Sequence, residues 1–440
     1  MTDLSQHEAP LIDGDGVDSP HVEWHARLRS KVNPRYVYAI LDQFIVSCGN
    51  LFVYASVARH CPTAEYGIFY LALRSLDILN QLCNVLIWGP FTFNLPQLKG
   101  DRGKWYLGSA FVHQLSVNAF GVVVLLAFAA FTHYRGDTTY SALFLPLAVP
   151  SVLIIFREFT RRMYFSQMRF RNAFFTDAAT TALQIAGVLY LVHRHTVSYA
   201  HALWVLSASC LAVSLYWLMS EGHRLHFNLD SIRNDFKLNL QLGRWFFGSN
   251  MLFVASAQAN PWILTAAIGP ASVAGYAFCD QVVTIPRVAL TSIQNTMAPS
   301  MSRAVAEGGK EALRKVVARM DRILIAGSAA FTIGIMLFGP WVSRTIFHHS
   351  PEHARLILCF LALNLLAYAA ALAQSYGLSA INRAQLNFYA GIFGLVVQLV
   401  LAVVLVHRMG VAGVALALFA GSLVVLGARI FYYMREMRRA

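Results

Sequence analysis

The 440-residue chain is too apolar for a soluble protein of its length, because 57% of its residues are hydrophobic, only 13% are charged and its mean hydropathy is +0.51. Its net charge of +13 is explained by basic loops at a membrane surface, so no nucleic acid partner is expected. All of the six cysteines except Cys61 lie within apolar stretches, and we therefore predict no disulfide framework.

The first predicted segment, residues 1–35, is a disordered acidic tail followed by a basic cytoplasmic lead-in. The stretch from Met1 to Trp24 contains six acidic side chains but no lysine or arginine, and this composition does not support a packed core. It has no basic stretch ahead of a short apolar core. We therefore expect the first span to direct membrane insertion without a cleaved signal.

Twelve apolar runs follow, each long enough to cross a bilayer as a helix. We therefore predict an all-α polytopic membrane protein with twelve transmembrane helices. Residues 36–220 form an N-terminal six-helix lobe, 221–243 a cytoplasmic amphipathic linker, 244–434 a C-terminal six-helix lobe and 435–440 a basic cytoplasmic tail. The predicted helices cover approximately 36–58, 66–96, 106–131, 141–165, 174–192, 197–220, 245–268, 273–301, 323–347, 354–377, 386–406 and 411–433.

The distribution of basic residues predicts the orientation. When successive loops are assigned to alternate sides, most of the 35 Lys and Arg fall on the side that holds both termini, and six fall opposite: Arg59, Arg135, Arg194, Arg344, Arg355 and Arg408. Basic loops stay in the cytoplasm. We therefore predict a multi-pass membrane protein with both termini in the cytoplasm.

The two halves of the chain carry an internal repeat. The tetrapeptide LVHR occurs at 191–194 and again at 405–408, and the same offset places Gln184 on Gln398. A second pair of matches, near the start of each half, places Pro62 on Pro270. Two six-helix halves with the same orientation are related by an axis along the membrane normal. The repeat therefore predicts two lobes around a central cavity.

Polar side chains form stripes on the predicted helices at 66–96 and 273–301. Steps of three and four residues place each stripe on one helix face, which must contact protein or water because a charge in hydrocarbon is costly. The stripes predict one water-filled cavity between the lobes. The predicted substrate-binding residues are Arg74, Gln81, Asn84 and Arg287, with Gln43 and Asn50 from the first span. The predicted ion-coupling residues are Asp42, Asp77 and Asp280.

A purely structural role is the alternative for these charges. Arg74 and Asp77 are spaced to pair on one helix face, and Arg287 is placed to reach Asp280 or a neighbouring helix. Arg157 and Glu158 are interpreted as side chains that extend to the membrane interface. No metal-ligand spacing, phosphate-binding glycine loop or nucleophile motif occurs. We therefore predict no cofactor and no metal, and we leave coupling to protons or sodium open.

The chain resembles the multidrug/oligosaccharidyl-lipid/polysaccharide exporter superfamily, and within it the lipid-linked oligosaccharide flippases of the Wzx type, which serve O-antigen or exopolysaccharide export. The resemblance lies in the six-plus-six arrangement and in the segments AEYGIFYLALRSLD and ASVAGYAFCDQVVTIPRVALTSIQNTMAPSMSRAVAEG. In both, a short outer loop leads through Gly67 or Gly275 into a long span. By similarity to lipid II flippases, the resemblance implies that Arg74 and Arg287 hold a diphosphate.

The resemblance implies a flippase, not an enzyme, that moves an undecaprenyl-diphosphate-linked oligosaccharide from the inner to the outer leaflet of the bacterial inner membrane by alternating access. Arginines in a partly desolvated cavity suit such an anion. The implied partners are the lipid-linked glycan, membrane lipids, a polysaccharide polymerase and a chain-length regulator. The alternative is a cation-coupled multidrug or metabolite antiporter of the same fold, which has no need of Arg74 and Arg287. A membrane enzyme is disfavoured because the predicted outer loops are too short to hold a catalytic site.

Overall fold

The computed structural model describes residues 34–95, 98, 101–347, 353–381 and 383–438, and the regular elements within these residues are all helices. The predicted acidic tail lies outside them, except for its last two residues. The helices are α2 (Pro34–His60), α3 (Thr63–Cys83), the π-helix η1 (Asn84–Trp88), α4 (Gly89–Asn94), α5 (Asp101–Tyr134), α6 (Thr138–Ser166), α7 (Phe170–His193), α8 (Tyr199–Glu221), the 3-10 turn η3 (Gly222–Arg224), α9 (Leu229–Ala267), α10 (Pro270–Phe347), α11 (Ala354–Ala370), α12 (Leu372–Ala380) and α13 (Ala384–Arg438).

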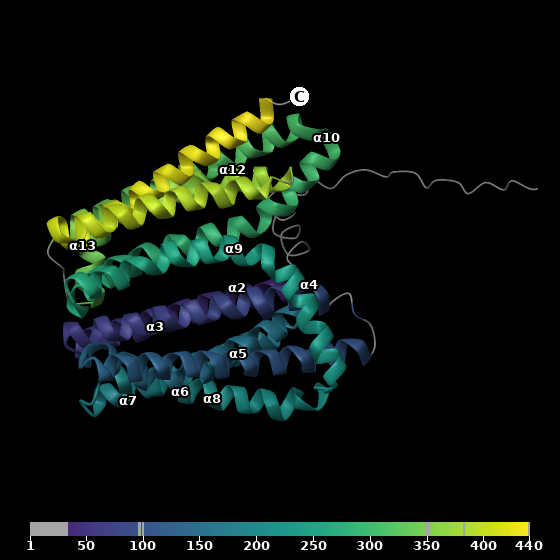
Figure 1. Cartoon of the computed structure of the whole chain (residues 1–440). Coiled ribbons are helices and arrows are strands. Elements are labelled where there is room, and N and C mark those ends of the chain that lie inside the picture. Colours follow the sequence, from purple (N-terminus) through teal and green to yellow (C-terminus); the bar gives the residue numbers. More distant parts are fainter. Residues whose placement is uncertain (1–33, 96–97, 99–100, 348–352, 382, 439–440) are drawn as a thin grey trace, which may run out of the picture.

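The helices form two lobes, which confirms the predicted fold class (Figure 1). The first lobe contains α2 to α8, and the second contains α9 to α13, with the long axes running side by side. Each lobe has a packed apolar and aromatic interior. In the first lobe, Trp217 of α8 meets Phe156 and Phe159 of α6 edge-on, with ring centroids 6.2 Å apart in each pair. Edge-to-face packing is the favoured geometry for aromatic pairs.

Each of the twelve predicted spans corresponds to a helix or to a short series of helices. The second span consists of α3, η1 and α4, and the tenth consists of α11 and α12. Helix α10 holds the eighth and ninth spans, which meet at Gly308 and Gly309, and α13 holds the last two, which meet at Gly410. Gly309 has φ of 59° and Gly410 has φ of 56°. A side chain is strained at such angles, so glycine lets the chain reverse there with a minimal break.

Hydropathy agrees with a membrane-spanning fold. Eight described stretches are long and apolar enough to cross a membrane by length and composition, and the longest of them, Ala384–Arg438, holds two spans. Helix α3 contains Arg74 and Asp77 within its apolar run. Such side chains avoid lipid, and α3 packs against α10 of the other lobe.

A π-helix interrupts the second span directly before Pro90. Pro90 has no N–H to donate, and the five residues of η1 accommodate the change in hydrogen bonding. The segment is anchored by Trp88, whose Nε1 donates to Oε1 of Gln114 in α5 at 2.8 Å. The irregularity before this proline is therefore a π-bulge with a fixed partner.

The predicted linker, residues 221–243, comprises η3, the segment 225–228 and the first part of α9, which continues without interruption into the seventh span. Its polar side faces the first lobe. Asp235, which is fully buried, pairs with Arg102 of α5, and Asn239 accepts a 2.7 Å hydrogen bond from the hydroxyl of Tyr106. Leu229 is 84% exposed, whereas Phe236 contacts the ring of His113 in α5, with ring centroids 5.4 Å apart. This part of α9 is thus held to the first lobe by buried polar side chains and by an aromatic contact.

Candidate functional site

The two lobes touch at one end of the molecule, which we call the closed end. Tyr66 of α3 stacks on Phe278 of α10, with ring centroids 4.9 Å apart and planes within 9°. Gly67 approaches the backbone of Pro270 so closely that a Cβ atom on it would lie 2.0 Å from the carbonyl oxygen. Arg59 of α2 donates to the carbonyl oxygens of Thr345 and Ile346 at 2.9 and 2.6 Å. The closed end is therefore held by backbone contact, stacking and hydrogen bonds together.

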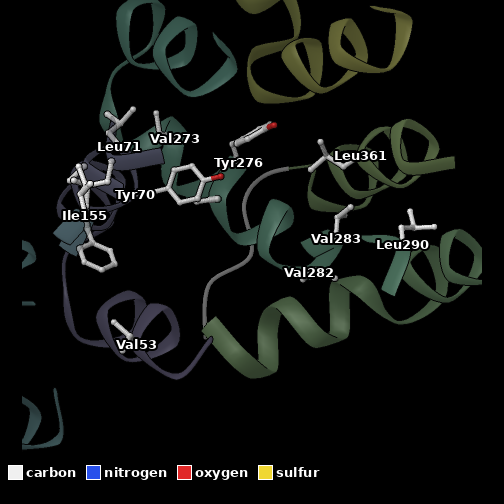
Figure 2. Close-up of a cluster of buried hydrophobic side chains, with 14 of the residues drawn as sticks. Val53, Tyr70, Leu71, Ile155, Val273, Tyr276, Val282, Val283, Leu290 and Leu361 are labelled. Carbon is white, nitrogen blue, oxygen red and sulfur yellow. The ribbon is translucent and has the colours of Figure 1, made fainter. Parts of the chain in front are cut away.

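A charged group lies beside these contacts and joins the lobes. We call Tyr70, Arg74, Asp77, Asp280 and Arg287 the junction cluster. Asp280 of α10 accepts from the Tyr70 hydroxyl at 2.8 Å and pairs with Arg74 at 3.4 Å and with Arg287 at 3.2 Å. Arg74 also pairs with Asp77 at 2.8 Å. Figure 2 shows Tyr70 reaching from α3 toward α10, near Tyr276. The structure thus brings the two predicted polar stripes together.

The junction cluster contains two guanidinium and two carboxylate groups, so its formal charges balance. The Asp280 side chain is only 8% exposed and Arg74 is 19% exposed, whereas Arg287 is 41% exposed. The Nε atom of Arg74 is buried and forms no hydrogen bond within the described residues. Guanidinium groups bind phosphate through several charge-assisted hydrogen bonds. The cluster therefore offers an anion two arginines, one from each lobe, of which Arg287 is the more accessible.

The other predicted binding residues lie apart from this cluster along α2, α3 and η1. Gln43 is exposed on α2 and approaches Ser47 at 3.4 Å. Asn50, two helical turns further along α2, lines a cavity inside the first lobe. Gln81 and Asn84 are partly buried on α3 and η1. Their predicted roles in substrate binding stay predictions.

A second charged group, missed by the sequence interpretation, lies inside the first lobe. Arg161 of α6 pairs with Asp42 of α2 and with Asp177 of α7, both at 2.7 Å. Arg157 pairs with Asp177 at 2.6 Å and with Glu158 at 3.2 Å. Arg157 and Glu158 are thus buried in the lobe and do not extend to the interface. An aspartate within the apolar run 174–192 was the available signal for Asp177, because a carboxylate inside a membrane span needs a partner.

Each predicted ion-coupling carboxylate is therefore already paired with arginine. Asp42 contacts Arg161, Asp77 contacts Arg74, and Asp280 contacts both Arg74 and Arg287. A coupling cation at any of the three would have to displace a guanidinium group. Within the described residues, no group of three or more His, Cys, Asp and Glu side chains is arranged to hold a metal ion.

We expect Arg161→Met to reduce the free energy of unfolding by about 3–5 kcal/mol, because it leaves Asp42 and Asp177 buried without this partner. Arg162→Met is the matched control. Arg162 is 46% exposed and contacts Glu158 at 3.4 Å, and its loss should change stability by at most about 1 kcal/mol. Unfolding of the purified protein in detergent, followed by tryptophan fluorescence, measures both. Equal effects would show that the buried group does not hold the lobe together.

Comparison with known proteins finds one matching family model and several solved structures of similar fold. The sequence model of the polysaccharide biosynthesis protein family matches residues 102–305. No curated protein matches the chain in sequence. A multidrug resistance transporter of the MATE family in an inward-facing conformation is similar in structure, with a TM-score of 0.73, 15% identity, and coverage of 91% of this chain and 98% of that one.

Two further solved structures are similar. An outward-facing structure of a MATE family multidrug resistance transporter gives a TM-score of 0.62 at 17% identity, covering 91% of this chain and 94% of that one. The lipid II flippase MurJ, in an inward closed conformation, gives 0.66 at 14% identity, covering 90% and 87%. The resemblance predicted from the sequence is thereby confirmed: the chain shares its fold with MATE family transporters of the MOP superfamily and with the lipid II flippase MurJ, and over residues 102–305 it is similar to the polysaccharide biosynthesis protein family.

Proposed function

We propose that this protein is a flippase that moves an undecaprenyl-diphosphate-linked oligosaccharide from the inner to the outer leaflet of the bacterial cytoplasmic membrane. The observation that carries the proposal is the junction cluster, in which Arg74 of one lobe and Arg287 of the other meet at Asp280. A diphosphate carries roughly two negative charges and takes several charge-assisted hydrogen bonds from guanidinium groups. A ligand bound here contacts both lobes, as alternating access requires.

The closed end supports a direction for loading. By the predicted orientation it is the outer end, because Arg59 and Arg344 belong to the loops with few basic residues. The higher TM-score against the inward-facing transporter, 0.73 compared with 0.62 for the outward-facing one, agrees with this direction. In this state the substrate enters from the cytoplasmic leaflet, and release requires the contacts of Tyr66 and Gly67 to open.

The membrane potential is the driving force we propose. The cell interior is negative, so outward movement of an anion is favoured by about 2.3 kcal/mol per charge per 100 mV. In vesicles containing the purified protein and a diphosphate-linked glycan, a potassium diffusion potential that is negative on the loading side should speed the transfer. The transfer should proceed without a sodium or proton gradient. Transfer that ignores the potential and requires either gradient would instead indicate ion coupling.

The same vesicles test the function itself. A fluorescent diphosphate-linked glycan is placed in both leaflets, and its accessibility to an external reagent is followed over time. Protein-dependent movement supports the proposal, and its absence in an otherwise folded protein contradicts it. The polysaccharide polymerase and chain-length regulator proposed as partners are then tested by co-purification with the full chain.

The fold similarity to MATE transporters favours one other candidate, a cation-coupled antiporter for drugs or metabolites. Such a carrier needs a carboxylate that is available to an organic cation. Asp42, Asp77 and Asp280 are all paired with arginine, which disfavours this role. Uptake of a fluorescent organic cation into vesicles under a proton or sodium gradient separates the two candidates.

A further inference from the structure

The first lobe contains a partly open polar cavity of about 280 Å³ that meets the junction cluster at Asp77. It lies halfway along α2, α3, α6, α7 and α8, among side chains that include Asn50, Tyr54, Asn80, Thr181 and Gln184. At roughly 30 Å³ per water molecule, this volume holds about nine waters or one sugar ring with its hydroxyl groups. It is too small for an oligosaccharide. We call it the first-lobe cavity.

The charges in the cavity wall are already neutralised. Arg157 and Glu158 pair with each other, Arg161 pairs with buried carboxylates, and Asp77 pairs with Arg74. A ligand that brought a net charge would have to break one of these pairs. The wall therefore favours a neutral ligand that forms hydrogen bonds.

Polar side chains of the cavity wall have unused hydrogen-bonding capacity. Asn80 Oδ1 and Arg157 Nε are buried and have no hydrogen-bond partner within the described residues. The side chains of Asn50, Thr181 and Gln184 line the same space; Thr181 is buried, Gln184 is half-buried and Asn50 is exposed. Buried polar groups are normally paired or hydrated. Hydroxyl groups of a sugar both donate and accept, so they suit this mixture of amide, hydroxyl and guanidinium groups.

The second lobe shows that the fold does not require a polar side chain without hydrogen bonds at this position. Gln398, the repeat equivalent of Gln184, is 1% exposed. Its amide accepts from the Ser256 hydroxyl at 2.5 Å and donates to Asn260 Oδ1 at 3.0 Å. The same residue type at the equivalent position is thus fully used inside one lobe and faces a cavity in the other. The difference marks the first lobe as the one adapted to a ligand.

Asp77 connects the cavity to the proposed anion site, because it lines the cavity and also contacts Arg74 at 2.8 Å. In a lipid-diphosphate glycan the first sugar is bonded directly to the outer phosphate. We infer that the first-lobe cavity binds this first sugar while Arg74 and Arg287 hold the diphosphate. The inference rests on the proposed function and adds to it a specific site for one neutral sugar ring.

Binding of two lipids to the purified full chain in nanodiscs tests the inference. The probes are undecaprenyl diphosphate without sugar and undecaprenyl diphosphate with a single hexose. The double variant Asn80→Leu/Thr181→Val removes polar atoms at nearly constant volume. It should weaken binding of the glycosylated probe by about tenfold, the size expected for two neutral hydrogen bonds, and leave the sugar-free probe unchanged. Arg74→Gln should weaken both probes.

Thr132→Val is the matched control, because Thr132 of α5 lies outside the cavity and its hydroxyl donates to the Phe128 carbonyl at 2.9 Å. It should change neither affinity. Melting temperatures of all variants establish that they fold. If the double variant affects both probes equally, or neither, the sugar site is wrong even though an effect of Arg74→Gln on both would keep the flippase proposal. If neither probe binds the unaltered protein, both the proposed function and the sugar site are wrong.

Discussion

Replacing Arg74 and Arg287 together with glutamine should reduce transfer of a diphosphate-linked glycan by roughly 100-fold or more, since each charged hydrogen bond contributes about 1.5–3 kcal/mol. Both side chains meet at Asp280 and supply the positive charge of the junction cluster. Glutamine keeps hydrogen-bond donors but removes the charge. The vesicle transfer assay gives the rate, and the melting temperature establishes that the variant folds.

The control for this result is Arg303→Gln combined with Arg319→Gln. Both arginines are exposed on α10 away from the junction, and Arg303 contacts only nearby Glu307 at 2.8 Å among the described residues. This pair removes the same formal charge without touching the proposed site, so transfer should stay near its original rate. Equal loss in both double variants would indicate an effect of overall charge. Undiminished transfer in the Arg74 and Arg287 variant would refute the anion site.

Gly67→Val should prevent the closed end from forming and stop transport. The added side chain would meet the Pro270 carbonyl, which lies 2.0 Å from the position of the first side-chain atom. A backbone carbonyl cannot move aside for the new side chain as the end of a flexible side chain could. Overpacking of this kind costs about 1–3 kcal/mol, enough to reduce the closed population by roughly 5- to 150-fold. Each lobe keeps its own interior, so we expect the variant to fold.

Electron resonance distances between two nitroxide labels measure this change. Labels at Tyr134 and Met409 report on the closed end, since both side chains are exposed there and belong to different lobes. The native cysteines are first replaced. The distance should lengthen in Gly67→Val and stay unchanged in Gly327→Val, because a Cβ atom at Gly327 meets no other atom within 4 Å. A normal distance together with normal transport would show that the contact at Gly67 is dispensable.

Much of the fold follows from patterns that are local in sequence. Apolar runs of membrane length predict the spans, and polar stripes at helical spacing predict which spans avoid lipid. Arg74 and Asp280 are in contact although 206 positions separate them. Their meeting was predictable in outline because the repeat assigns them to equivalent helices of two facing lobes.

Other features depend on contacts that no local pattern contains. Arg161 and Asp42 lie 119 positions apart and pair inside one lobe, whereas a basic residue near a helix end suggests the membrane interface by default. The π-helix before Pro90 depends on its packing against α5 as well as on the proline itself. The first-lobe cavity exists because the surrounding side chains leave space unfilled, which no local pattern reveals. Gln184 and Gln398 occupy equivalent positions of the repeat, so the sequence does not distinguish them. Only packing distinguishes a satisfied amide from a free one.

Helix α9 has a mechanical consequence. One part of it is fixed to α5 through Asp235 and Asn239, and the remainder forms a wall of the second lobe. A continuous helix transmits bending and torsion along its axis. When the closed end separates, a change in the tilt between the lobes is therefore transmitted along α9 to its contacts with α5.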